Sequence, residues 1–299
     1  RPPGPEDRRL SVMLPAHDPR PDWFAAALDS VLEHAPEDAE IVVLDDGSPS
    51  NVAKDVATRR GPRVAYRRNG VRLGRAGNHR ACFDQARGAL VHILHQHDRV
   101  LPGFYDALLP PLREDGSLVG AASAVWRIDD SGARAVAPEA ERPDPGPIDL
   151  APRLRVNQRL RFAGLIARRA AYYASGGFAD GLRHGFDLEL WERLCALGPL
   201  WHEPARLAEA RLHGQPGAGD PERYDKTLDA MRVVAMIAAR RRNTDPLPAL
   251  SRVFRRALRD LTRLPPETRQ RIAALALDGW GADERAWAEA VIAAITPTE

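Results

Sequence analysis

The sequence predicts an α/β fold in which helices flank a mostly parallel sheet and a helical subdomain follows at the C-terminus. Residues 10–94 alternate short apolar runs with helical segments, which is the pattern of βαβ units. Polar clusters, Asp45-Asp46 and His95–Asp98, come directly after two of the predicted strands. From Pro221 onward, the segments between Pro and Gly signals all have helical spacing.

The first half of the chain is predicted to contain four strands joined by three helices. A continuous β-branched run that ends in an Asp-Gly-Ser-Pro turn is typical of a buried parallel strand, and apolar side chains repeating every three or four residues predict a helix. The strands are predicted at Leu10–Pro15, Ile41–Leu44, Val64–Arg67 and Leu90–Leu94. The helices are predicted at Pro21–His34, Asn51–Arg60 and Gly74–Arg87.

The second half is less regular. Residues 128–153 are rich in Asp, Pro and Gly, which suits a hairpin, a long loop or a mobile lid. Phe162–Ala167 is predicted as a strand followed by a helix through Tyr173, and Asp187–Leu197 is predicted as a helix. Four further helices are predicted at Glu222–Arg242, Leu247–Leu261, Glu267–Leu277 and Ala282–Ile295.

Composition excludes several classes of protein. The 299 residues carry a net charge of +2, which disfavours a dedicated nucleic-acid binder because such proteins need a basic excess or face. The 43 basic residues comprise two lysines and 41 arginines, a bias best explained by GC-rich codons. Two cysteines give no disulfide framework or zinc spacing and suit the cytoplasm. No apolar run approaches the roughly 18–20 residues of a membrane span, and the polar residues 1–9 suit a disordered lead-in rather than a signal peptide.

The two polar clusters predict a ligand site, because ligands of parallel α/β sheets bind beyond the carboxyl ends of the strands. The carboxylates of Asp45 and Asp46 can accept hydrogen bonds from a nucleotide base or a ribose; alternatively, the Asp-Gly-Ser turn caps the following helix. Asp98 offers the oxygen donor that Mg²⁺ and Mn²⁺ prefer.

Four segments together resemble the family 2 glycosyltransferases with a GT-A fold. They are Ser11–Asp18, Val42–Asn51, Gly74–Ala81 with Val91–Tyr105, and Ser175–Leu194. The resemblance covers about residues 10–215 and implies a GT-A (Rossmann-like) mixed, mostly parallel sheet. It divides the chain into a nucleotide-sugar half at 10–105, an acceptor half at 106–215 and the helical subdomain at 216–299.

The resemblance also implies which residues meet the donor nucleotide. Asp46 is implied as the contact to the base, and Arg72, beside Gly70 and Gly74, as a contact to the nucleotide, although a solvated arginine is the alternative. The full set of candidate nucleotide contacts is Pro15, His17, Asp45, Asp46, Arg72 and His97.

A divalent metal, Mn²⁺ or Mg²⁺, is the implied cofactor. The family typically carries an acidic triplet where this chain reads His95-Gln96-His97-Asp98, so His97 replaces an acid while Asp98 remains as the best metal ligand. His97 either supplies a nitrogen ligand, which would favour Mn²⁺ or a later transition metal, or signals weaker metal dependence. His213 is the third candidate ligand, because related enzymes often place a histidine near this position.

The catalytic base is expected at Asp187. In the family an acidic pair precedes the Leu-Trp of this helix, and here Phe186-Asp187 keeps the second acid only. The alternative for Asp187 is a helix N-cap next to Gly185. Glu189 and Glu192 are interpreted as solvated or salt-bridged.

These residues predict a nucleotide-sugar-dependent glycosyltransferase, a hexosyl- or pentosyltransferase that uses a UDP-sugar with inversion; retention stays open. The acceptor is unidentified, with a small natural product, a peptide or a glycan precursor as candidates. One alternative is a degenerate member that binds a nucleotide sugar or a partner without turnover, motivated by His97 and Phe186. A nucleotidyltransferase is disfavoured, because residues 15–19 contain none of the glycines that its phosphate loop needs.

Overall fold

The computed structural model describes residues 9–135, 144–149 and 160–212, with six helical positions between 226 and 237. These positions are 226, 229, 232, 233, 236 and 237. Residues 1–8 of the predicted lead-in and nearly all of the predicted C-terminal helices lie outside the described residues.

Strands and helices alternate through the first half of the chain. All the described strands are β1 (Leu10–Ala16), β2 (Glu40–Asp45), β3 (Val64–Arg68), β4 (Leu90–Ile93), β5 (Arg99–Val100), β6 (Gly120–Ile128), β7 (Gly146–Ile148), β8 (Leu165–Arg168) and β9 (Leu200–Arg211). The helices are α1 (Pro21–His34), α2 (Val52–Thr58), α3 (Gly74–Gln85), α4 (Phe104–Glu114), the 3-10 turn η1 (Phe162–Gly164), α6 (Arg169–Ala174) and α7 (Phe186–Cys195).

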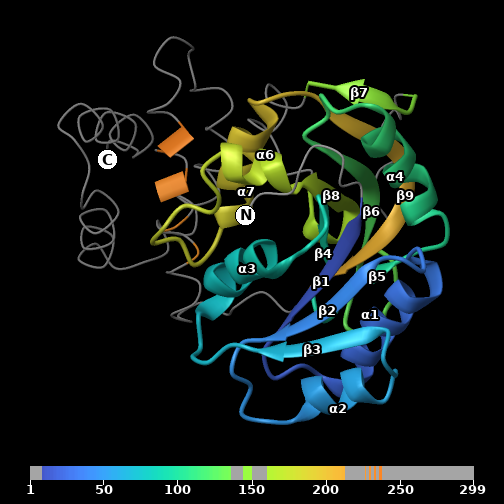
Figure 1. The fold of residues 1–299 in the computed structure, drawn as a ribbon, viewed down its shortest axis with the longest axis vertical. Coiled ribbons are helices and arrows are strands. Elements are labelled where there is room, and N and C mark those ends of the chain that lie inside the picture. The colour runs from blue at the N-terminus through green and yellow to red at the C-terminus, as the bar shows by residue number, and fades with distance from the viewer. Residues whose placement is uncertain are drawn as a thin grey trace, which may run out of the picture. The chain divides into compact units, whose positions relative to one another are not determined.

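The strands form one nine-stranded sheet in the order β3-β2-β1-β4-β8-β6-β9-β5, with β7 paired to β9 (Figure 1). Strands β3, β2, β1 and β4 are parallel, so their carboxyl ends lie at one edge. Beyond β4 the sheet changes character, because β8 pairs antiparallel with both β4 and β6. The predicted mixed sheet is therefore confirmed, and its parallel part is the half predicted as βαβ units.

One face of the sheet packs against α1, α2 and α4, and the principal core lies there. Alternate residues of β1 point into this core, including Leu10, Val12 and Leu14, because successive side chains of a strand face opposite sides. They meet apolar side chains of α1 such as Phe24 and Leu28, which recur at helical spacing. The core thus fixes β1 and α1, and with them the loop that joins them.

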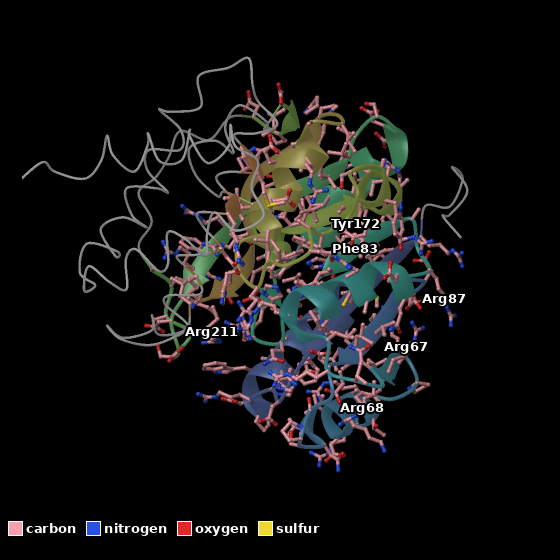
Figure 2. The ribbon with its side chains drawn as sticks, turned by 90° about the vertical axis from the view of Figure 1, so that its left-hand side faces the viewer. Arg67, Arg68, Phe83, Arg87, Tyr172 and Arg211 are labelled. Atoms are coloured by element: carbon pink, nitrogen blue, oxygen red, sulfur yellow. The ribbon has the colours of Figure 1, made fainter. Side chains whose placement is uncertain are left out.

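The opposite face carries α3, which packs on β1, β2 and β4, and α6 packs on β8. Phe83 of α3 and Tyr172 of α6 stack with ring centroids 3.8 Å apart and planes 5° from parallel (Figure 2). Asn78 of α3 donates its side-chain amide to the carbonyl of Leu44 at 3.1 Å. These contacts hold the start of α3 close to the carboxyl end of β2.

Some predicted elements differ from the structure. Phe162–Gly164 is a 3-10 turn rather than the start of a strand, and β8 begins at Leu165. A Cβ at Gly164 would lie 2.5 Å from a methyl group of Val125, so only glycine fits at this position without a shift of its neighbours. Helix α4 was not predicted; it holds Pro110 and Pro111 in its interior, where proline usually ends a helix.

The chain divides into two compact units, which are described separately. The first comprises Arg1–Leu150, Arg159–Gly177 and Arg193–Gly214, and the second comprises Ala151–Gln158, Phe178–Glu192 and Gln215–Glu299. Within the described residues, no helix is long and apolar enough to cross a membrane.

Candidate functional site

The loops that follow β1, β2 and β4 meet at the carboxyl edge of the parallel strands. The amide of Gln96 bridges the backbone of His17, accepting from its N–H at 2.8 Å and donating to its carbonyl at 3.3 Å. The His17 ring nitrogen Nδ1 lies 3.1 Å from the carbonyl of Asp46, and the backbone N–H of Asp18 donates to Ser48 at 2.8 Å. Three loops distant in the sequence therefore form one connected surface.

The predicted nucleotide contacts on β1 lie within this surface. Pro15 is buried in β1 opposite Leu44, and His17 is half-buried just past the strand end. Asp18 has a φ of 42°, a left-handed conformation that is uncommon for a residue other than glycine. Such a conformation at a strand end fixes where the following backbone groups point.

The Asp46 carboxylate ties the start of α3 to the end of β2. It accepts the backbone N–H groups of Leu73 at 2.7 Å and Gly74 at 2.8 Å, and the Asn69 amide at 3.0 Å. These N–H groups open α3 and would otherwise lack partners within the helix. The predicted capping role of the Asp-Gly-Ser turn thus occurs at a different helix, because Asp46 caps α3 and not the following helix α2.

Asp45 is fully buried on the other side of the same strand end. It accepts hydrogen bonds from Ser48, from the Tyr66 hydroxyl at 2.7 Å and from Arg68 at 2.9 Å. Burial alone would raise the pKa of Asp45, but the hydrogen bonds from Ser48 and Tyr66 outweigh it, so the pKa is lowered. The carboxylate is thus ionised and surrounded by protein groups rather than turned to solvent.

Arg72 lies beside the turn after β2. A Cβ on Gly47, whose φ is +69°, would sit 3.7 Å from the Cβ of Arg72, so the two backbones run close together. The Arg72 side chain is exposed, with no hydrogen bond or ion pair to any other described residue. It is therefore available to a ligand at this edge.

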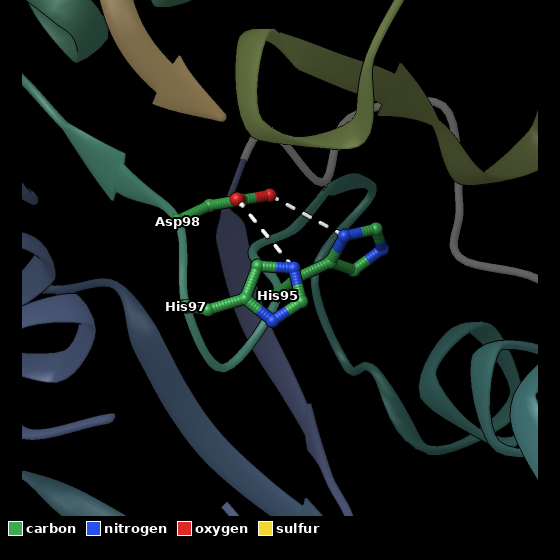
Figure 3. A group of neighbouring side chains, drawn as sticks. All are labelled: His95, His97 and Asp98. Carbon is green, nitrogen blue, oxygen red and sulfur yellow. Dashed lines mark ion pairs between the residues drawn. The ribbon is translucent and has the colours of Figure 1, made fainter. Parts of the chain in front are cut away.

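Three side chains after β4 form the one described cluster that could hold a metal ion: His95, His97 and Asp98 (Figure 3). Nδ1 of His95 lies 3.3 Å and Nε2 of His97 lies 3.7 Å from the Asp98 carboxylate. One ligand atom from each residue can be chosen so that all three lie within 4.8 Å of one another. The donor set of two nitrogens and one oxygen fits a divalent transition metal.

Asp98 is buried, and its Oδ1 accepts the backbone N–H of Arg211 at 2.9 Å. Burial acts to raise the pKa of Asp98, but the hydrogen bond from His95 and the charges of His97 and His95 outweigh it, so its pKa is lowered. The cluster therefore presents a negatively charged oxygen.

Arg211, at the end of β9, is a residue that sequence reasoning missed. Its guanidinium donates to the carbonyls of Asp129, Asp130 and His97, and lies 4.4 Å above the Trp23 ring. It thereby joins the ends of β6 and β9 to the metal-capable loop. No sequence signal separates it from the other arginines, although it lies two residues before the predicted ligand His213.

His79 of α3 was also missed. Its Nδ1 lies 2.7 Å from the carbonyl of Arg75, and its Nε2 lies 2.9 Å from Nε2 of His95. Burial, followed by the charge of His95, lowers the pKa of His79 well below 6.5, so the ring is neutral. A histidine on a buried helix face is usually structural, which is why the sequence alone gave no reason to select it.

Two of the predicted residues are not among those that form the described surface. His213 lies outside the described residues. Asp187 is half-buried in the first turn of α7 and belongs to the second compact unit. Helix α7 begins at Phe186, and the N–H of Glu189 donates to the Gly185 carbonyl at 3.1 Å, so Asp187 is inside the helix and is not its N-cap.

Two acids of α7 differ from expectation. Glu189 and Glu192 are 0% and 6% exposed, so of the two alternatives, solvated or salt-bridged, burial rules out only the first. Also in the second unit, Asp229 accepts the N–H groups of Arg183 at 2.7 Å and His184 at 2.8 Å, which anchors the backbone before α7.

Comparison with known proteins places the chain in a sequence family. Residues 11–172 match the family model described as glycosyl transferase family 2. A Mycobacterium tuberculosis (strain CDC 1551 / Oshkosh) protein called uncharacterized protein MT1568 is 36% identical over 120 residues, which is 40% of this chain. That stretch spans only 37% of the mycobacterial protein.

The fold is similar to that of Staphylococcus aureus TarS. The structure of TarS residues 1–349 in complex with UDP has a TM-score of 0.67 and 15% identity, covering 89% of this chain and 78% of that one. The complex with UDP-GlcNAc has a TM-score of 0.66 and 15% identity, covering 90% of this chain and 79% of that one. The likeness shows that the two chains share a fold.

Proposed function

Because the chain belongs to glycosyl transferase family 2, we propose that it moves a sugar from a nucleoside-diphosphate sugar to an acceptor. The donor is a UDP-sugar, and the acceptor is a small natural product, a peptide or a glycan precursor. The observation that carries this proposal is the convergence of the loops after β1, β2 and β4, with the cluster of His95, His97 and Asp98 at the same edge. TarS, which shares the fold, holds UDP and UDP-GlcNAc in its crystal structures, which supports a uridine nucleotide here.

The donor nucleotide is proposed to lie across the ends of β1 and β2. A carboxylate has about four acceptor positions, and three groups already donate to Asp46, which leaves room for a base N–H. Arg72, which is exposed on the neighbouring loop, is proposed to contact the nucleotide together with the backbone at Pro15 and His17. Asp45 is assigned a positioning role, because protein groups occupy its carboxylate.

Asp98 and His97 are proposed to hold a divalent metal, with His213 as a further candidate. A bound divalent cation supplies Lewis-acid stabilisation to a diphosphate leaving group. Asp98 provides the anionic oxygen and His97 a neutral nitrogen, which favours Mn²⁺ over Mg²⁺ because Mg²⁺ prefers oxygen donors. Arg211 holds Asp98 in place through its backbone N–H.

Asp187 is proposed as the base that accepts the proton of the acceptor nucleophile. An inverting transfer is a single displacement, so one carboxylate suffices. Asp187 is the second residue of α7, and its side chain is half-buried, which leaves part of the carboxylate exposed. Phe186, which replaces the first acid of the family's pair, is buried beside Phe178.

The direct test is a panel of nucleotide sugars. Thermal-shift measurements with Mn²⁺ and Mg²⁺ name the donor and the metal together, because a bound ligand raises the melting temperature. We expect a UDP-sugar to stabilise the chain in the presence of metal, and UDP to be released when an acceptor is supplied.

The second candidate is a protein that binds a nucleotide sugar without turnover, motivated by His97 and Phe186 in place of acids. Tight donor binding, with no nucleoside diphosphate released for any acceptor in a broad panel, would favour it and contradict the enzyme proposal.

A further inference from the structure

A chain of polar contacts runs from the interior of α3 to the metal-capable cluster. The carbonyl of Arg75 lies 2.7 Å from Nδ1 of His79, whose Nε2 lies 2.9 Å from Nε2 of His95. Nδ1 of His95 in turn lies 3.3 Å from the Asp98 carboxylate. We propose that His95 is a metal ligand through Nδ1, and that His79 is a positioning residue that fixes the tautomer of His95. This inference rests on the proposed metal-assisted function and adds a ligand and its support to it.

The hydrogen-bond partners assign the tautomers. A backbone carbonyl only accepts, so Nδ1 of His79 must carry a proton. His79 is 3% exposed, and burial disfavours a charged ring, so its Nε2 is a lone pair that accepts. Nε2 of His95 must therefore be the donor in the contact between the two rings.

This assignment directs the other nitrogen of His95 at Asp98. Nδ1 of His95 lies 3.3 Å from the Asp98 carboxylate oxygen (Figure 3). A proton on Nδ1 can bridge these two atoms, and a divalent cation, which competes with protons for a ring nitrogen, can take its place. One ligand atom of His97 also lies within 4.8 Å of the other two groups, so the three side chains can close around one cation.

The surroundings of His79 suit a support rather than a ligand. Its ring packs against Phe162 of η1 with centroids 4.9 Å apart, and its helix is held at its start by Asp46. Metal-bound histidines commonly donate their second ring N–H to a fixed acceptor, which sets tautomer and orientation. His79 is such an acceptor, and it is itself fixed by the carbonyl of Arg75.

Two nitrogens and one carboxylate also predict which metal is preferred. Imidazole suits the later first-row metals such as Co²⁺ and Zn²⁺ better than Mn²⁺, and Mg²⁺ prefers oxygen ligands. The full chain should therefore bind Co²⁺ more tightly than Mg²⁺ in isothermal titration calorimetry. Co²⁺ should also give a visible absorption band that reports nitrogen coordination.

The test uses variants of the full chain titrated with Co²⁺. His95→Ala should remove the nitrogen ligand and lower the affinity. His79→Leu and His79→Phe remove the acceptor and should weaken binding by about 10- to 100-fold, the usual effect of losing such a support. His79→Gln keeps an acceptor oxygen and should stay within about threefold of the wild type. His34→Leu, on α1 and outside the cluster, is the matched control and should bind normally.

Circular dichroism establishes that each variant is folded before it is titrated. Unchanged Co²⁺ affinity and absorption in His95→Ala would overturn the proposal, whether or not the His79 variants fold. Unchanged affinity in a folded His79→Leu or His79→Phe would overturn the role of His79. UDP release measured on the same proteins separates the two claims. If the protein turns over a donor but binds Co²⁺ equally well without His95, this inference is wrong and the proposed function stands. If Co²⁺ binding depends on His95 but no donor is turned over, the proposed function is wrong and this inference stands.

Discussion

At the scale of single residues, the chemistry of the site depends on one ionised carboxylate. Asp98 is buried, yet two histidines and the backbone of Arg211 keep it charged. The other two members of the described cluster are histidines, His95 and His97, so Asp98 contributes its one carboxylate. A carboxylate held this way can bind a cation without first being rearranged.

We predict that Asp98→Asn abolishes metal-dependent donor turnover. The amide preserves the shape and can still accept from the Arg211 backbone, but it lacks the negative charge that the cation requires. The loss should be at least about 100-fold, comparable to removing one electrostatic group from other active sites. UDP release with saturating Mn²⁺ measures it.

The matched control for this change is Asp106→Asn, an exposed aspartate in the first turn of α4, which should retain full activity. Wild-type turnover in Asp98→Asn would show that the metal, if one is used, is held elsewhere.

Asp187→Asn should separate binding from chemistry. If Asp187 is the base, the variant keeps donor affinity, because the donor contacts lie on other residues. It should lose transfer by about 10²- to 10⁴-fold, the range for removal of a general base. Calorimetry with UDP and an acceptor-dependent assay measure the two quantities on one preparation, and an unaltered transfer rate would show that the base is wrongly assigned.

At the scale of elements, a strand end and a helix start are tied by a side chain. Asp46 belongs to the loop after β2, yet it caps α3, whose own preceding residue Leu73 has no side chain that could do so. Arg211 acts similarly between β9, β6 and the loop after β4. The surface proposed to bind the donor is therefore held by polar contacts between elements.

We predict that Asp46→Ala lowers the free energy of unfolding by about 1–2 kcal/mol, the range for loss of a helix cap. The N–H groups of Leu73 and Gly74 would lose their acceptor. Asp46→Asn keeps one acceptor oxygen and should cost less. Urea unfolding measures both, and Asp55→Ala, an exposed aspartate of α2, is the control. Equal stability of Asp46→Ala and the wild type would contradict the capping role.

At the scale of the whole molecule, we predict that the free energy of unfolding decreases at low pH because Asp45 becomes protonated. Its pKa is lowered in the folded chain, so the unfolded chain binds more protons just below pH 3.8. The stabilisation from Asp45 is therefore complete at neutral pH and is lost as pH falls below about 4 through the folded value.

Urea unfolding of the wild type and Asp45→Asn between pH 7 and pH 3 tests this expectation. The variant should be less stable than the wild type at pH 7, and the difference between them should shrink at pH 3. Parallel stability curves would show that Asp45 contributes no protonation linkage.

The sequence by itself determined the parallel half of the sheet and the position of its polar edge. Apolar β-branched runs followed by polar turns are local signals, and helical spacing likewise placed α1 at its observed bounds. The four motifs that indicate the family can also be read from the sequence, because each lies within one or two short continuous stretches of the chain. Asp46 and Asp98 were selected as candidate site residues because each follows a predicted strand.

Only the tertiary structure decided what these residues contact. The contact of His79 with His95, the contacts of Arg211 and the capping of α3 by Asp46 join residues between 16 and 114 positions apart. Helix α4, with Pro110 and Pro111 inside it, forms because its apolar face packs on β6 and β9. Spacing in a sequence encodes neighbours along one element, whereas hydrogen bonds between elements depend on how the sheet and helices pack, which no local pattern records.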